Sequence, residues 1–119
     1  MADLQAMYDQ AYDLLCDGNT DAAIEAYKAI LQIDPQHVEA VHDLAHAYAD
    51  AGRLDDAIAA ARRLTELTPE DPMGFTILSR FYQQQGMVPE AEAEAAKARM
   101  LDWKRQLLEK KTAKAQSEQ

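Results

Sequence analysis

The sequence predicts an all-α protein: an α-solenoid of three antiparallel helix-turn-helix repeats with an extended or capping C-terminal helix. Two observations predict this fold class. Glycine recurs every 34 residues, at Gly18, Gly52 and Gly86, and an alanine follows five residues after each one. Between these positions, apolar residues recur at the spacing of a helix rather than a strand. A fixed period of this length is typical of stacked helical hairpins.

The first repeat is predicted over residues 4–37. Gly18 can adopt the left-handed backbone that ends its first helix, and Asn19 or Thr20 can cap the second helix. Gln10 stands where the later repeats have leucine. A polar residue there fits a first helix that has no neighbour before it.

The second repeat is predicted over residues 38–71. Its first helix has an apolar face that includes Leu44 and Tyr48. Gly52 again ends this helix, and Asp55 is expected to cap the helix that follows.

The third repeat is predicted over residues 72–105, so that residues 1–105 form the repeat region. Asp71 is expected to cap its first helix, with Pro72 at the first helical position. Pro89 opens the second helix, and Trp103 stands where the earlier repeats have proline.

Residues 106–119 are predicted to form a basic helical extension whose end frays from Ala113 to Gln119. From Pro89 to Ala115 there is neither proline nor glycine, and helix-favouring residues dominate. One long helix is favoured over a bend followed by a short capping helix. The apolar residues of this region could cover the open end of the stack: Met100, Leu101, Trp103, Leu107 and Leu108.

The composition excludes several classes of protein. The chain has 119 residues, a net charge of −9 and one cysteine, which favours a single cytoplasmic domain without disulfides. An acidic body opposes nucleic-acid binding, and no apolar run is long enough to span a membrane. Charge is uneven, because residues 1–35 carry −6 and residues 104–119 carry +3. We expect no cofactor and no enzymatic activity, since no phosphate-binding loop or paired nucleophile is present.

A 34-residue helix-turn-helix with glycine, alanine and proline in these columns resembles the tetratricopeptide repeat. The resemblance implies that the first helices of the hairpins line a concave groove that binds peptides. Helical spacing then selects the inward-facing residues: Tyr8, Asp9, Tyr12, Glu39, His42, Asp43, His46, Asp50 and Arg80.

These residue types indicate a partner peptide that carries Lys or Arg and an apolar side chain. The two tyrosines would anchor apolar groups, although they could instead pack between helices. The acids would attract basic side chains, while His42, His46 and Arg80 would form hydrogen bonds.

One subclass of the family binds acidic chaperone tails through Lys, Asn and Arg. The matching positions here hold no basic residue: Tyr8, Tyr12, Asp43, Met73 and Ile77. We therefore expect no binding of that type.

Two further alternatives follow from the residues. The repeats could self-assemble into a homo-oligomer, with the basic C-terminal helix meeting the acidic body of a neighbour. His42 and His46 lie four residues apart, as in H-E-x-x-H zinc sites, but no third ligand is evident from the sequence. Metal binding through this pair is thus a remote alternative, and we predict no metal site.

Overall fold

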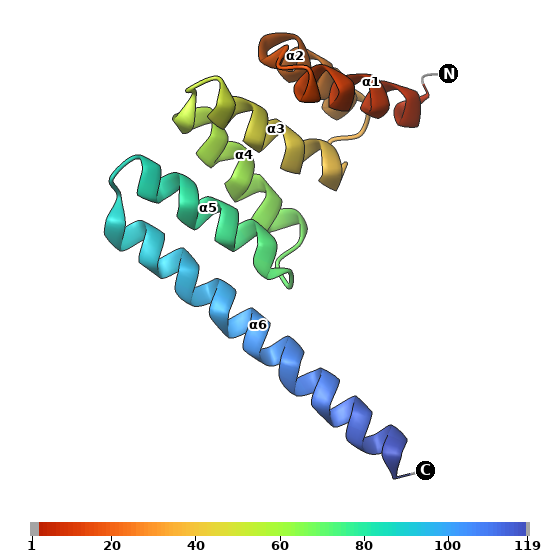
Figure 1. The fold of residues 1–119 in the computed structure, drawn as a ribbon, viewed down its shortest axis with the longest axis vertical. Helices are drawn as coiled ribbons and strands as arrows, with labels where there is room; N and C mark the ends of the chain where they lie inside the picture. The colour runs from red at the N-terminus through yellow and green to blue at the C-terminus, as the bar shows by residue number, and fades with distance from the viewer. Residues whose placement is uncertain (1–2, 119) are drawn as a thin grey trace.

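A computed structural model describes residues 3–118 and shows six helices in this part of the chain (Figure 1). They follow the predicted order in three hairpins and confirm the all-α solenoid. Their bounds are α1 Leu4–Cys16, α2 Thr20–Ile33, α3 Val38–Asp50, α4 Leu54–Leu67, α5 Pro72–Gln84 and α6 Val88–Ser117.

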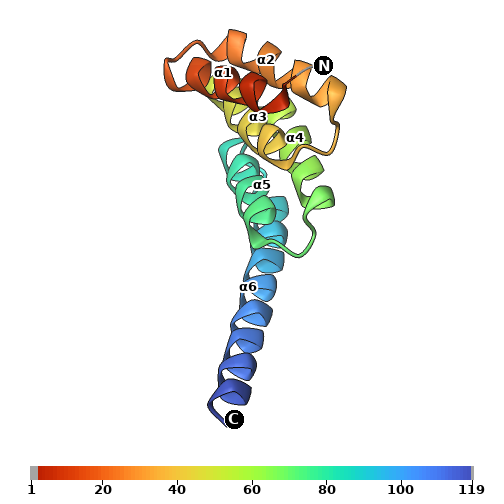
Figure 2. The same cartoon turned by 90° about the vertical axis from the view of Figure 1, so that its right-hand side faces the viewer.

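The helices pack in chain order, each against the next, so the hairpins stack along one direction (Figures 1 and 2). The predicted glycines make the tight turn within each hairpin possible. Gly18, Gly52 and Gly86 have φ values of 82°, 77° and 78°, in the left-handed region that a side chain disfavours.

Small residues let the helices of the solenoid approach closely. Ala11, Ala45, Ala57 and Ala91 are all fully buried where helices cross. Larger side chains fill the remaining space in two apolar clusters. One cluster lies around Tyr27 among α1, α2 and α3, and the other joins α3 through α6.

The helix caps agree only partly with the predictions. Asp71 caps α5 as expected, since its side chain accepts a hydrogen bond from the Met73 amide at 2.9 Å and Pro72 is the first helical residue. The prediction for Asp55 is wrong. α4 begins one residue earlier, at Leu54, so Asp55 lies inside the first turn of α4. Its side chain instead accepts a hydrogen bond from the Gln85 side chain at 2.7 Å.

α6 is one continuous helix of 30 residues, as favoured from the sequence. The expectation that its apolar residues cover the end of the stack is wrong for Met100, Trp103, Leu107 and Leu108, which remain exposed. The helix does not turn back, and its C-terminal end leads away from the hairpins (Figure 1). Residues 113–117 are helical in the structure, and their fraying stays a prediction.

Candidate functional site

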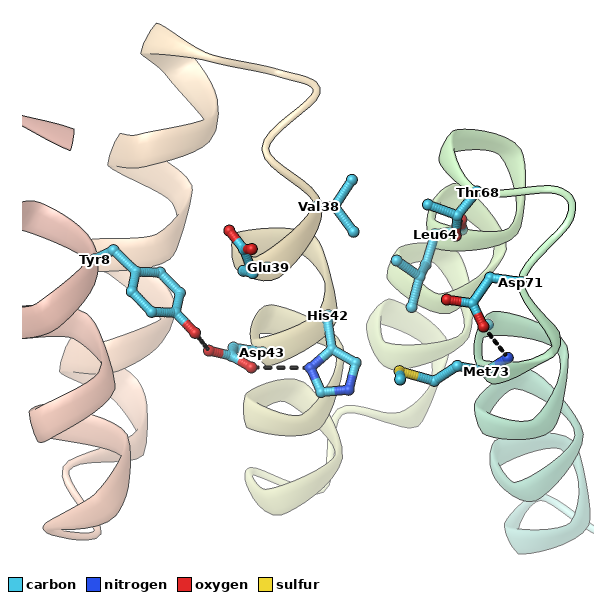
Figure 3. Close-up of a pocket in the computed structure, with 10 residues that line it drawn as sticks. Tyr8, Val38, Glu39, His42, Asp43, Leu64, Thr68, Asp71 and Met73 are labelled. Atoms are coloured by element: carbon cyan, nitrogen blue, oxygen red, sulfur yellow. Dashed lines mark hydrogen bonds and ion pairs between the residues drawn. The ribbon is translucent and has the colours of Figure 1, made fainter. Parts of the chain in front are cut away.

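A cavity of about 340 Å³ lies between α3 and α5 and is the centre of the candidate site (Figure 3). Tyr8 of α1 borders it on one side, and the end of α4 closes another. Most of its lining atoms are apolar, while carboxylates stand among them. The lining residues are Tyr8, Val38, Glu39, His42, Asp43, Leu64, Thr68, Asp71, Met73 and Gly74. We call this cavity and its rim the groove.

The structure brings four of the nine predicted site residues into the groove: Tyr8, Glu39, His42 and Asp43. The other five lie outside its lining. Asp9 and Tyr12 are exposed on α1, and Asp50 is exposed at the end of α3. His46 is half-buried against Phe81, with ring centroids 6.0 Å apart. Arg80 lines a second hollow between α5 and α6.

Asp43 differs from its predicted role as an exposed attractor of basic side chains. The residue is 9% exposed, and three neighbours occupy its carboxylate. Tyr8 and Tyr27 donate their hydroxyls to Oδ2 at 2.6 and 3.0 Å, and His42 Nδ1 lies 2.9 Å from Oδ1. Asp43 therefore ties α1, α2 and α3 together, because Tyr8 and Tyr27 come from different helices of the first hairpin.

This network shifts the ionisation of its members. Burial by itself would raise the pKa of Asp43, but hydrogen bonds from His42, Tyr8 and Tyr27 outweigh it and hold the pKa below its ordinary value. Burial, together with the Asp43 charge, raises the pKa of both tyrosines well above 10. The carboxylate is therefore ionised and the phenols are neutral donors at neutral pH.

The charge state of Asp43 also fixes the hydrogen-bonding role of His42. An ionised carboxylate can only accept, so the proton of a neutral His42 ring belongs on Nδ1. Its Nε2 is then left as an acceptor at the edge of the groove, where Figure 3 shows the ring between Asp43 and Met73. A partner group that donates a hydrogen bond fits this position.

The two tyrosines of α1 differ in burial. Tyr8 is half-buried and packs between helices, with its ring stacked on His37 at a centroid distance of 5.7 Å. Tyr12 stacks on Tyr8 at 6.3 Å and remains 49% exposed. Tyr8 thus forms one wall of the groove, and Tyr12 presents an exposed aromatic face next to Tyr8.

His42 and His46 pack against each other, and His46 also packs against a core aromatic ring. The rings of His42 and His46 lie 4.8 Å apart between centroids, and His46 also contacts Phe81. Burial, followed by the nearby charge of His42, lowers the pKa of His46. Across residues 3–118, no group of three or more His, Cys, Asp or Glu side chains is arranged to hold a metal ion.

Sequence reasoning missed a second wall of the groove, which is formed by Leu64, Thr68 and Asp71. These residues come from the end of α4 and the loop before α5, whereas the prediction considered only the first helix of each hairpin. Val38 was also missed, although it directly precedes Glu39 on the same helix. α4 packs against both α3 and α5, which brings these residues to the groove, and the repeat period alone gives no signal for it.

Comparisons with known proteins agree with the fold. The family model for the tetratricopeptide repeat matches residues 14–77. No curated protein shows a significant sequence match to the chain. None of the helices in the described part of the chain has both the length and the apolar character needed to cross a membrane.

Several solved structures have a similar fold. MamA superposes with a TM-score of 0.82 at 22% identity, covering 86% of this chain and 60% of its own. The Yersinia enterocolitica type III secretion translocator chaperone SycD gives 0.78 at 20% identity, covering 82% of this chain and 73% of its own.

PcrH, solved in complex with the chaperone binding region of PopB, gives a TM-score of 0.78 at 18% identity, over 82% of this chain and 79% of its own. The present chain therefore spans about three fifths of MamA and more of the two others. With the family model covering more than half of its residues, this chain belongs to the tetratricopeptide repeat family.

Proposed function

We propose that the chain is a non-enzymatic adaptor that binds a segment of a partner protein in the groove. The observation that carries this proposal is the cavity between α3 and α5, whose apolar lining is bordered by carboxylates. PcrH, which has a similar fold, was solved with a segment of PopB, and this supports a protein partner.

The partner segment is proposed to be basic and apolar. Glu39 is exposed at the rim. Among residues 3–118, the nearest basic nitrogen to its carboxylate is His37 Nδ1, at 3.8 Å, which is too far for a hydrogen bond. The Glu39 charge is therefore free to attract Lys or Arg. Met73 on α5 also lines the groove, is 50% exposed and offers apolar contact. The free Nε2 of His42 would accept a hydrogen bond from the segment. Asp43 contributes indirectly, because it orients His42 and Tyr8.

Selection from a random peptide library, with the folded chain as bait, tests the proposal. We expect the selected peptides to combine Lys or Arg with large apolar residues. Glu39→Lys should abolish this enrichment by reversing the charge at the rim. Glu25→Lys is the matched control, because Glu25 is an exposed acid on α2 that lies outside the groove.

The affinity of one selected peptide should then be measured by fluorescence anisotropy. Glu39→Gln is expected to weaken binding by up to about fivefold, since an exposed ion pair contributes about 0.2–1 kcal/mol. Enrichment of acidic peptides, or enrichment that survives Glu39→Lys, would rule out the groove as a site for basic segments.

A further inference from the structure

Within residues 3–118, the last part of α6 buries no residue against another helix. We call residues 103–118 the extension, and every one of them is exposed. Figures 1 and 2 show the extension continuing straight out from the stacked hairpins. Large apolar side chains are nevertheless present on it, with Trp103, Leu107 and Leu108 exposed by 57%, 45% and 65%.

Four residues of the extension form one helical face that suits docking into a groove. Lys104, Leu107, Leu108 and Lys111 are spaced i, i+3, i+4 and i+7, and together they line a shallow apolar hollow of about 290 Å³. This spacing is how a helix presents anchors to a groove. We call these four residues the seam.

The charge of the extension is complementary to that of the first repeat. Residues 104–119 carry +3 and residues 1–35 carry −6. Neither seam lysine forms an ion pair with an acid among residues 3–118. The seam therefore offers two leucines and two unpaired cations, which is the chemistry proposed above for a segment bound in the groove.

We infer that the extension of one copy docks in the groove of a second copy of this chain. Leu107 and Leu108 enter the cavity between α3 and α5, and the seam lysines face Glu39 and the acidic surface of α1 that includes Asp9. This inference rests on the proposed function, because it uses the same groove and names its occupant.

The occupant is a second copy because the extension cannot reach its own groove. α6 is unbroken from Val88 to Ser117 and leads away from α1 and α3 (Figure 1). Folding the extension back would require helical hydrogen bonds in α6 to break. Docking onto another chain leaves the helix intact.

End-to-end stacking of solenoids is a weaker route to self-association. The face of α3 and α5 that packs on the preceding hairpin has buried Leu44 and Leu78, whereas α1 has exposed Gln10 at that position. On the opposite end, α6 has exposed Glu92 where α2 and α4 bury isoleucine. Polar groups at both ends would lose hydration on stacking.

The full chain should be studied by sedimentation equilibrium at low and high salt. We expect a mass above the 13.3 kDa of one chain at low salt, and a decrease toward that value at high salt as the ion pairs are screened. Lys104→Glu/Lys111→Glu should weaken association at least about tenfold, because charge reversal places like charges together. Arg105→Glu/Lys110→Glu is the matched control of equal charge change away from the seam face, and it should associate as the unaltered chain does.

The groove side is tested by Asp9→Lys/Glu39→Lys, with Asp21→Lys/Glu25→Lys on α2 as the control of equal charge change. We expect only the groove variant to lose association. An equimolar mixture of the seam variant and the groove variant should associate again, because the acidic extension of one now meets the basic groove of the other. Circular dichroism verifies that each variant is folded.

A chain that stays at 13.3 kDa at low salt and high protein concentration would overturn the inference. Association that the seam and groove variants leave unchanged would also overturn it. Either result leaves the proposed function standing if peptide selection still depends on Glu39. Failure of peptide selection together with loss of association in both variants would instead mean that the groove serves only self-recognition.

Discussion

The solenoid and the extension are both helical, but different forces hold them. In residues 3–102, α1 to α5 and the first half of α6 bury one face against neighbours, and Ala91 and Ala98 anchor α6 on α5. In residues 103–118 no residue is buried. The comparison shows that tertiary packing positions the first region, whereas local preference maintains the second.

The residues of the extension explain why it needs no packing to be helical. It consists mostly of Lys, Leu, Gln, Glu, Ala and Arg, which are strong helix formers. Asp102 also accepts hydrogen bonds from Arg105 and Gln106 at 2.5 and 3.1 Å, one helical turn ahead. The extension is further joined to a packed helix, so it does not have to nucleate by itself.

The largest contrast is expected from removing an aromatic ring in each region. Phe81 is 2% exposed, so Phe81→Ala should lower the free energy of unfolding by about 3–5 kcal/mol through loss of burial and formation of a cavity. Trp103→Ala removes a larger ring from an exposed position and should change it by less than about 0.5 kcal/mol. Urea denaturation measures both, and equal losses would show that the extension packs on the body.

A smaller contrast is expected from removing a carboxylate. Asp43→Ala leaves the hydroxyl of buried Tyr27 without its acceptor and should destabilise the chain by about 2–3 kcal/mol. Glu109 is exposed in the extension, and Glu109→Ala should have almost no effect on the urea midpoint. A small loss for Asp43→Ala would mean that water replaces the carboxylate in the network.

The smallest effect is expected from pH. Because burial lowers the pKa of folded His46 below the ordinary histidine value of about 6.5, the unfolded chain binds this proton first as pH falls. The contribution of His46 to stability is therefore complete above pH 6.5 and decreases as pH falls from there through the folded pKa. The extension contains no histidine, so its helicity should not follow this change.

His46→Gln is the control for this titration, measured by urea denaturation between pH 7.5 and 5. The variant should show a shallower decrease of stability with falling pH than the unaltered chain. Parallel curves for the two proteins would assign the pH dependence to other groups.

The repeat period predicted the fold well because each hairpin is a local unit. Gly52, the buried alanines and the Asp71–Pro72 cap act within a few residues or at a fixed period, so the sequence shows them directly. The cap at Asp55 was mispredicted because Leu54 already begins the helix and Gln85 of another hairpin binds the aspartate. The lining of the groove was predicted in part. Glu39 and His42 could be predicted because they lie on one face of α3, whereas Leu64 reaches the groove only because α4 packs against α3.

The sequence by itself determined the helices, their turns and the uneven charge, since these follow from local preference, periodicity and composition. The tertiary structure decided what each polar group does. Asp43 became a buried acceptor for three donors because three helices meet at its carboxylate. Trp103, Leu107 and Leu108 were left exposed because α6 continues straight instead of turning back onto the stack. Such outcomes depend on where distant segments pack, and no local pattern encodes that.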